Sequence, residues 1–438
     1  MIGRLYTLLL VLLLPYILFH LLWRSRRQPE YLRHIGERFG FYRGKPATPL
    51  IWLHAVSVGE TRAAVPLVAQ LQARYPHHRI LLTHMTPTGR ETGRQLFGDR
   101  VMQCYLPYDF PFAVKRFLRH FKPEIGLLME TEIWFNLVQA CKKAGVPLLL
   151  VNARMSEKSA RNYGRFKTLC RDSLQALSAI AAQTEADARR FVELGAPAVK
   201  ITGNLKFDVA VPQSAIDLGK NLREQFGAAR PAFLAASTRE GEEVLIMEAL
   251  TKIDIPSLLI VIVPRHPQRF DQVADMLTQR NIRFQRRSEL GFAGMGDKSP
   301  NSQNQPVAPE TQVLLGDSMG EMFAYYAACD IAFIGGSLLP LGGQNLIEAT
   351  AMGKPVLIGP HTFNFAEVSE LAVQAGAALR VANAEELVLT VGDLLKAPEK
   401  IKAMSVAALA FSDRHRGATE RLMALIGYAW AQKRAHPT

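Results

Sequence analysis

The chain has 438 residues, of which 48% are apolar and 21% are charged. This composition excludes an intrinsically disordered chain, and the length predicts two or three domains. The formal net charge of +13 suits nucleic acid, an acidic membrane surface or an anionic substrate, and charge alone does not choose among them. The four cysteines are widely spaced, with no neighbouring Cys or His cluster: Cys104, Cys141, Cys170 and Cys329. We expect reduced thiols and no structural zinc.

The N-terminus contains an apolar run, Leu5–Trp23, of about the length that spans a bilayer core. Pro15 interrupts the run and would kink a helix there. Basic residues dominate the flanks, at Arg4, Arg24, Arg26, Arg27, Arg33 and Arg38. Because no small-residue cleavage site separates the run from the arginines, we expect a retained membrane anchor in residues 1–27. The positive-inside rule then places the rest of the chain in the cytoplasm. A half-inserted interfacial helix is the alternative.

The segment that follows the anchor, 24–47, is strongly basic and carries interleaved aromatic residues. Such a composition is typical of a segment that lies on anionic lipid, although single-stranded nucleic acid is also bound by aromatics and cations together. The position of the segment beside the apolar run favours lipid.

Apolar runs of strand length alternate with helix-length segments along most of the chain, which predicts parallel sheets covered on both faces. The strands are expected at Leu50–Ala55, Ile80–Thr83, Val101–Tyr105, Ile125–Met129, Leu148–Val151, Ile180–Ala182 and Val199–Ile201, and then at Ala232–Ala236, Leu258–Val263, Val313–Leu315, Ile331–Ile334, Pro355–Ile358 and Ala378–Val381. Pro212 interrupts the pattern, so we place a linker at 211–218. The sequence therefore predicts an α/β domain at 28–210, a second at 219–400 and helices at 401–438, the two domains facing each other across a cleft.

Polar clusters stand at the ends of several predicted strands of the first half. Ser57 can cap a helix that begins with Glu60, and Glu130 and Glu132 come directly after an apolar strand. Since the carboxyl ends of parallel strands share one edge of a sheet, these side chains should line one crevice. A carboxylate at such a place can accept a proton from a substrate. The alternative for Glu60 and Glu132 is that each only complements the positive end of its own helix.

The second half has phosphate-binding features in place of carboxylates. Arg265 follows an apolar run and can pair bidentately with a phosphate, and a helix that begins near Gly320 would offer backbone N–H groups. The glycines at 335–336 and 342–343 permit close approach of the backbone, and Glu348 lies one turn into the following helix, where it can accept ribose hydroxyls. None of these stretches is a dinucleotide fingerprint or a Walker loop.

Taken together, the motifs resemble those of the 3-deoxy-D-manno-octulosonic acid (Kdo) transferase family, over nearly the whole chain. The motifs are Ser57–Glu60, Met129–Glu132, Asn152–Arg154, Gly203–Asp208, Pro264–Pro267, Gly335–Ser337, Gly342–Asn345 and Gly359–Phe365. Two positions depart from the pattern: Arg239 stands where many relatives have His, and Leu346-Ile347 stands where Pro-Leu is common.

The resemblance implies a GT-B fold, with C-terminal helices that cross back to the first domain. It implies CMP-Kdo as the donor and the lipid A precursor lipid IVA as the acceptor, at the cytoplasmic side of the cell inner membrane. It makes Glu60 the general base and has Glu130 and Lys206 stabilise the transition state. It assigns CMP binding to Pro264, Arg265, Met319, Gly320, Glu321, Asn345, Leu346, Ile347 and Glu348, with no metal, cofactor or nucleic acid.

The chemistry of these residues agrees with an inverting transfer, in which an acceptor hydroxyl attacks directly as a base takes its proton. The role of Glu130 stays open, because its charge would repel a donor carboxylate unless it is protonated or orients Lys206. Two other functions remain alternatives: a GT-B enzyme that uses a nucleoside diphosphate sugar, and a membrane-tethered nucleic-acid binder, against which the lack of a recognisable binding motif speaks.

Overall fold

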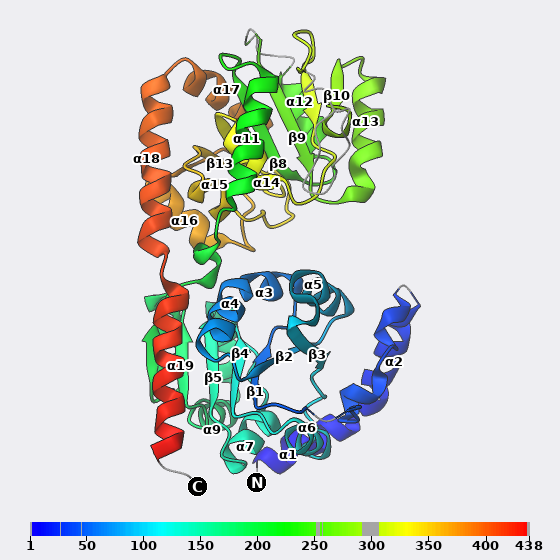
Figure 1. Cartoon of the computed structure of the whole chain (residues 1–438), viewed down its shortest axis with the longest axis vertical. Helices are drawn as coiled ribbons and strands as arrows, with labels where there is room; N and C mark the ends of the chain where they lie inside the picture. Colours follow the sequence, from blue (N-terminus) through cyan, green and yellow to red (C-terminus); the bar gives the residue numbers. More distant parts are fainter. Residues whose placement is uncertain are drawn as a thin grey trace. The chain divides into compact units, whose positions relative to one another are not determined.

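The computed structural model describes residues 2–26, 28–44, 46–250, 255, 257–290 and 306–435. The chain divides into two compact units (Figure 1). Unit 1 consists of Met1–Val209 together with His415–Thr438, and unit 2 of Ala210–Arg414. The first unit is therefore built from both ends of the chain.

Unit 1 has a parallel sheet in which the described strands follow the order β3-β2-β1-β4-β5-β6-β7. The strands are β1 (Leu50–His54), β2 (Arg79–His84), β3 (Val101–Tyr105), β4 (Ile125–Met129), β5 (Leu148–Ala153), β6 (Ala179–Ala182) and β7 (Val199–Ile201). The helices are α1 (Ile2–Leu12), α2 (Leu14–Ser25), η1 (Pro29–Tyr31), η2 (Ile35–Phe39), α3 (Val58–Ala63), α4 (Val65–Arg74), α5 (Pro87–Phe97), η3 (Gly98–Arg100), α6 (Pro111–Phe121), α7 (Phe135–Lys143), α8 (Glu157–Gly164), α9 (Lys167–Leu174), α10 (Glu185–Glu193), η4 (Leu205–Asp208) and α19 (Ala418–Ala435).

Both faces of this sheet are covered, as its largely apolar strands β1, β4, β5 and β6 require. Alternate residues of each strand point to opposite faces, so Leu53 packs toward α4 and α19, whereas Trp52 packs toward α6, α7 and α9. The α19 side is closed by Leu422, Met423, Ile426 and Trp430. The last helix of the chain is thus part of the core of unit 1.

Unit 2 repeats the architecture, with a parallel sheet whose described strands follow the order β10-β11-β9-β8-β12-β13-β14. The strands are β8 (Ala232–Thr238), β9 (Leu259–Pro264), β10 (Phe284–Arg286), β11 (Val313–Leu315), β12 (Ile331–Ile334), β13 (Val356–Ile358) and β14 (Ala378–Arg380). The helices are α11 (Gln213–Phe226), α12 (Glu242–Leu250), η5 (Pro267–Arg269), α13 (Phe270–Gln279), η6 (Arg287–Glu289), α14 (Met322–Ala328), α15 (Ile347–Ala351), α16 (Ala366–Gln374), α17 (Ala384–Leu395) and α18 (Pro398–His415).

The predicted α/β class with two parallel-sheet domains is confirmed, and two local expectations need adjustment. Most of the stretch expected as an irregular linker, 211–218, lies in α11. Pro212 stands at the N-cap of that helix, so it marks a helix start and not an irregular segment. Of the helices expected at 401–438, α19 belongs to unit 1, whereas α18 belongs to unit 2 up to Arg414.

No single helix in the described part of the chain is long and apolar enough to cross a membrane. The pair Gly3–Leu12 and Leu14–Ser25 meets the length and composition criteria together, with a bend of 48° at the break. The membrane anchor stays a prediction.

The start of α19 is attached to the rest of unit 1 by the Asp208 carboxylate. Its two oxygens accept hydrogen bonds from the backbone N–H groups of Gly417, at 2.7 Å, and Thr419. These groups belong to the first turn of the helix, where backbone donors lack partners within the helix and negative charge is favourable. Arg421 adds a hydrogen bond of 2.8 Å to the Thr202 carbonyl.

We expect Asp208→Ala to lower the free energy of unfolding of unit 1 by about 1–3 kcal/mol, because the half-buried Gly417 N–H and the buried Thr419 N–H lose their acceptor. Urea denaturation followed by tryptophan fluorescence measures the change. Asp208→Asn, which keeps one acceptor, should lose less. The matched control is Asp275→Ala on the exposed side of α13, and equal effects of the two alanine variants would contradict this role of Asp208.

Candidate active site

Unit 1 has its strand-order reversal between β1 and β4. The loops that leave two such strands diverge to opposite faces of the sheet and open a crevice at their carboxyl ends, where α/β proteins bind ligands. Glu60 follows β1 and Glu130 follows β4. Two of the three residues predicted to be catalytic therefore stand at this reversal.

Glu60 is held rigidly at the start of α3. Its backbone N–H donates to the Ser57 hydroxyl, which caps the helix, and the same hydroxyl donates to Glu60 Oε1 at 2.8 Å. The Val56 N–H donates to Oε2 at 2.9 Å. The residue is 7% exposed, and burial, followed by the nearby charge of Glu130, raises the pKa of Glu60 to about 7. The carboxyl is thus poised to exchange a proton near neutral pH.

Glu130 has a left-handed backbone conformation, with φ of 57°. A residue other than glycine rarely adopts this conformation, and such strain is typical of functional positions. The chain turns away from β4 at this residue. The Glu130 carboxylate forms an ion pair with Lys206 Nζ, at 3.9 Å. All three predicted catalytic residues are therefore at the carboxyl end of the same sheet.

The position of Lys206 depends on two asparagines. The Asn152 side chain, fully buried after β5, accepts a hydrogen bond from the Leu205 N–H at 3.0 Å, and Asn204 accepts one from the Lys206 N–H at 3.0 Å. Together they fix the short helix η4 against the strand ends. Glu132, by contrast, accepts a hydrogen bond of 2.8 Å from the Trp134 indole within its own loop, and burial raises its pKa.

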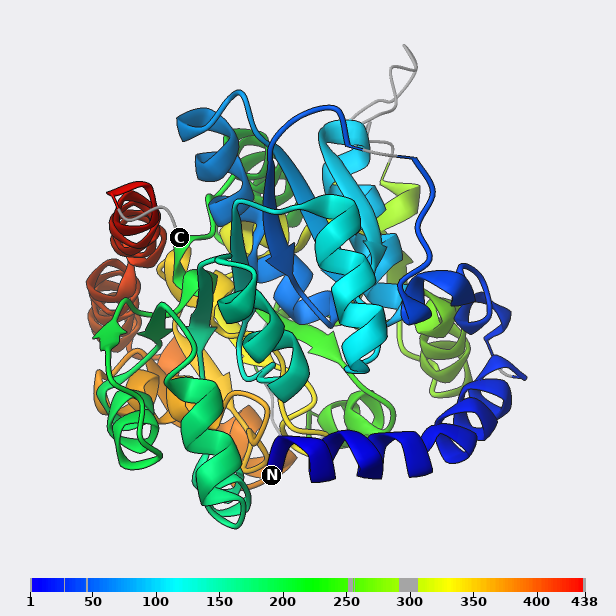
Figure 2. The ribbon, with the colours of Figure 1, turned by 90° about the horizontal axis from the view of Figure 1, so that it is seen from below.

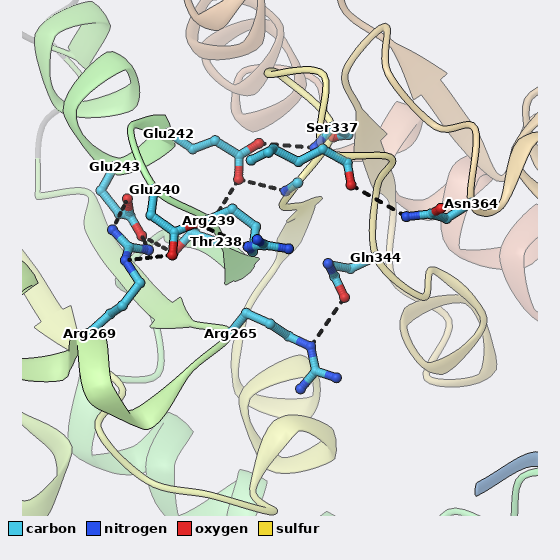
Figure 3. A network of polar contacts seen from close by, with 12 residues as sticks. Thr238, Arg239, Glu240, Glu242, Glu243, Arg265, Arg269, Ser337, Gln344 and Asn364 are labelled. Carbon is cyan, nitrogen blue, oxygen red and sulfur yellow. Dashed lines mark hydrogen bonds and ion pairs between the residues drawn. The ribbon is translucent and has the colours of Figure 1, made fainter. Parts of the chain in front are cut away.

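Unit 2 has its strand-order reversal between β8 and β12, and a buried carboxylate connects the two strand ends there. Glu242, the first residue of α12, accepts hydrogen bonds from the N–H groups of Gly336, Ser337 and Leu338 at 2.6–3.0 Å and from that of Arg239 at 2.9 Å. Figure 3 shows this carboxylate between the two loops. The loop after β12 is consequently fixed in the conformation that its glycines permit.

Basic side chains surround this junction (Figure 3). Arg269 forms a bidentate ion pair with Glu243, at 2.6 and 3.0 Å, and Glu243 also accepts from the Thr238 hydroxyl at 2.7 Å. Arg265 Nε donates to Gln344 Oε1 at 3.2 Å. This last contact joins the Pro264-Arg265 motif to the glycine-containing loop that precedes Asn345.

The other residues predicted to bind CMP have different surroundings. Pro264 is buried at the end of β9, whereas Met319 and Gly320 are exposed after β11, the strand beside β9. Glu321 is held inside unit 2 by an ion pair of 3.2 Å with Arg287 and a hydrogen bond of 2.7 Å from Ser318. Its carboxylate is thus part of a structural network.

At the start of α15, Asn345 Oδ1 accepts from the Ile347 N–H at 3.1 Å, and Asn345 Nδ2 donates to Glu348 at 3.4 Å. The side chains of Leu346 and Ile347 are fully buried, so these two residues have only backbone groups to offer a ligand. Glu348 is half-buried and is the charged member of this segment.

Sequence reasoning did not single out Glu242 or Arg269, and it named Asn152 and Gln344 only as members of motifs, without a role for either side chain. Glu242 is the first residue of a helix, where a carboxylate is common for electrostatic reasons alone, so its contact with a loop more than ninety residues later carries no local signal. Within the described ranges, no cluster of three or more His, Cys, Asp or Glu side chains is arranged to hold a metal ion.

Comparison with known proteins agrees with this arrangement. The family model of 3-deoxy-D-manno-octulosonic-acid transferase (kdotransferase) matches residues 33–209. The 3-deoxy-D-manno-octulosonic acid transferase of Bordetella pertussis is 44% identical over 437 residues and covers 96% of this chain and 98% of its own. That of Haemophilus influenzae is 39% identical over 428 residues, covering 96% and 97%.

Among solved structures, a glycosyltransferase from Rickettsia africae is similar in fold, with a TM-score of 0.57 at 13% identity over 88% of this chain and 98% of that one. The likeness supports the GT-B class for the two sheets. The identities to the curated relatives are high, and they extend over nearly the full length of each chain. The chain therefore belongs to the 3-deoxy-D-manno-octulosonic acid transferase family of glycosyltransferases.

Proposed function

We propose that the protein transfers Kdo from CMP-Kdo to the lipid A precursor lipid IVA, with inversion at the anomeric carbon, on the cytoplasmic face of the cell inner membrane. Unit 1 supplies the base and binds the acceptor, and unit 2 binds the donor. The observation that carries the proposal is Glu60, a rigidly held carboxyl with a pKa near 7 at the strand-order reversal of unit 1.

Glu60 acts as the general base. A sugar hydroxyl is a weak nucleophile, and removal of its proton as the new bond forms contributes roughly 10²–10⁴-fold to the rate. A base whose pKa lies near the working pH is both deprotonated in a large fraction of molecules and strong enough to accept the proton. Burial supplies this pKa, and the hydrogen bonds from Val56 and Ser57 fix the direction of the carboxylate.

Lys206 stabilises the transition state. Kdo carries a carboxylate next to its reacting carbon, and a cation near that carboxylate offsets its charge as the bond to the leaving group breaks. The ion pair of Lys206 with Glu130 supports an orienting role for Glu130, which positions the ammonium group. The same carboxylate raises the pKa of Glu60, so Glu130 also tunes the base.

The cytidine monophosphate group binds at the carboxyl edge of the unit 2 sheet. Arg265 contacts the phosphate, and its hydrogen bond to Gln344 aligns the planar guanidinium for that contact. Backbone groups of Asn345–Ile347 and the Glu348 carboxylate contact the nucleoside. The acceptor hydroxyl attacks directly, so the configuration at the anomeric carbon is inverted and CMP leaves with the bonding electrons.

Incubation of the purified protein with CMP-Kdo and lipid IVA, followed by mass spectrometry of the lipid, tests the proposal. We expect the lipid to gain the mass of Kdo, and we expect CMP to inhibit the reaction much more strongly than UDP. Stronger inhibition by UDP, or no gain in mass, would contradict the proposed donor and acceptor.

We predict that Glu60→Gln lowers kcat by about 10²–10⁴-fold, because the amide cannot take the proton. In the unaltered protein kcat/KM should rise with pH up to about 7 and then level off, since only the ionised carboxyl accepts a proton. The variant should lack this dependence while it binds CMP as tightly as before. A variant that keeps more than a tenth of the activity would exclude Glu60 as the base.

Glu60→Gln should also make unit 1 more stable at alkaline pH. The pKa of Glu60 is raised from 4.5 to about 7 in the folded state, so the charged form is disfavoured by folding and the free energy of unfolding falls as pH rises between these values. The amide removes this penalty, which amounts to roughly 1–3 kcal/mol. Thermal unfolding measures the effect: the melting temperature of the variant should exceed that of the unaltered protein by more at pH 8.5 than at pH 5. A variant with the lower melting temperature at both pH values would contradict the assigned pKa.

Arg265→Ala should weaken CMP binding by about 10–100-fold, the loss expected for a charged hydrogen-bonding group that contacts a phosphate. Isothermal titration with CMP measures the effect, and Arg265→Lys should recover only part of it because lysine lacks the planar fork. Arg280→Ala, which removes an exposed arginine paired with Glu248, is the control and should bind CMP normally. Equal affinity of the Arg265 and Arg280 variants would remove Arg265 from the phosphate site.

A further inference from the structure

The first helix of the chain is docked on unit 1 by specific polar contacts. The Tyr6 hydroxyl donates to Asp109 at 2.9 Å, and the Thr7 hydroxyl donates to Asn136 Oδ1 at 3.2 Å. Asp109 in turn accepts from the first backbone N–H groups of α7 at 2.8 and 2.9 Å. Gly3 lies so close to Phe135 that an added Cβ would be 2.5 Å from its ring. The helix is therefore seated on α7.

The opposite side of α1 is apolar and uncovered in the structure. Leu5, Leu8, Leu9 and Leu12 are each more than half exposed. Exposed leucines in such a row are costly in water, and a helix of this kind lies favourably at the boundary between headgroups and acyl chains. The contacts to α7 hold the helix beside the folded unit while its leucines face outward.

Helices α1, α6 and α7 lie at the same end of unit 1 (Figures 1 and 2). Residues of α1, α6, α7 and α9 line a groove of about 1240 Å³ there. Its charged lining comprises Arg4, Lys115, Arg119, Lys122, Lys143 and Asp172. Five of these described side chains are basic and one is acidic. Leu118, Phe135 and Ala140 supply apolar surface in the same groove. A ligand that fits must combine negative charge with hydrocarbon.

We propose that this groove binds one anionic phospholipid of the bilayer, with its phosphate among the five cations and its acyl chains along the exposed leucines of α1. The charge of the lining selects an anion, and the adjoining apolar face of α1 distinguishes a lipid from a free phosphate. Of the described residues that line the groove, none is Glu60, Glu130 or Lys206. The lipid is thus a bound companion of unit 1, not the acceptor of the sugar.

This site explains how α1 can be both docked on the protein and attached to the membrane. A generic basic surface would attract anionic lipid without fixing its position, whereas a groove lined by four helices holds a single molecule. The proposal does not depend on the identity of the donor or on the role of Glu60. Failure of the transfer assay would therefore leave the lipid site standing. Failure of the lipid-binding test would likewise leave the proposed transfer reaction standing.

The test compares two triple variants of the full chain, Lys115→Gln/Arg119→Gln/Lys143→Gln in the groove and Lys158→Gln/Arg189→Gln/Lys200→Gln on other exposed surface of unit 1. Both lose three positive charges. Native mass spectrometry after extraction from phosphatidylglycerol nanodiscs counts the lipids that stay bound, and sedimentation with phosphatidylglycerol or phosphatidylcholine vesicles measures affinity.

We expect the unaltered protein and the control variant to retain one phosphatidylglycerol and no phosphatidylcholine. The groove variant should lose that adduct, with binding weaker by on the order of 100-fold, or about fivefold for each cation removed. Its thermal unfolding and its activity on acceptor dispersed in detergent should be unchanged. The charge-preserving variant Lys115→Arg/Arg119→Lys/Lys143→Arg should retain the adduct.

Three results would overturn the proposal. Equal losses in the groove and control variants would mean that only overall charge matters. Displacement of the adduct by inorganic phosphate at the same concentration would mean that the acyl chains do not contribute. Displacement by lipid IVA in the Glu60→Gln variant, one molecule for one, would make the groove a subsite for the acceptor.

Discussion

The arrangement of this protein depends on one constraint, that parallel strands all end at the same edge of their sheet. Where the strand order reverses, two neighbouring loops leave in opposite directions, and the polar groups that follow those strands meet in the opening. Unit 1 has Glu60 and Glu130 at its reversal, and unit 2 has Glu242 and the glycine loop after β12. Both sheets thus reverse their strand order beside their first strand, although in unit 2 β11 lies between β9 and β10, and they differ in the chemistry placed at the reversal.

The two buried carboxylates at these points have different environments. Glu242 accepts four backbone hydrogen bonds, which compensate its charge and make it a fixed connection between two loops. Glu60 accepts one backbone and one hydroxyl hydrogen bond and lies near a second carboxylate. Its charge is less well compensated, so the proton is held until higher pH. Burial raises the pKa of both carboxyls, but the four backbone donors oppose that effect at Glu242, whereas the neighbouring Glu130 adds to it at Glu60.

Much of the fold could be predicted because its strands are apolar runs with abrupt polar ends. The predicted bounds of β11 and β12 match the structure, and the catalytic candidates stood at strand ends where the structure places them. The edge strand β10 was missed, since three half-buried residues give no hydrophobic pattern. The helix expected to begin with Glu60 is short, ending at Ala63, and α4 follows it because Pro66 lies in the first turn of α4 and fits a new helix start. The pKa of Glu60 arises from burial and from the distant Glu130, which local sequence does not encode. The left-handed conformation of Glu130 has no signal in its residue type.

The closure of unit 1 by α19 has a consequence for synthesis of the chain. One face of its sheet is covered by Leu422, Met423, Ile426 and Trp430, which leave the ribosome only after all of unit 2. Until then a nascent chain exposes an apolar strip on an otherwise formed sheet, beside an N-terminal segment that is itself apolar. Premature termination anywhere within unit 2 would therefore yield a product with an open core, prone to aggregation and to proteolysis.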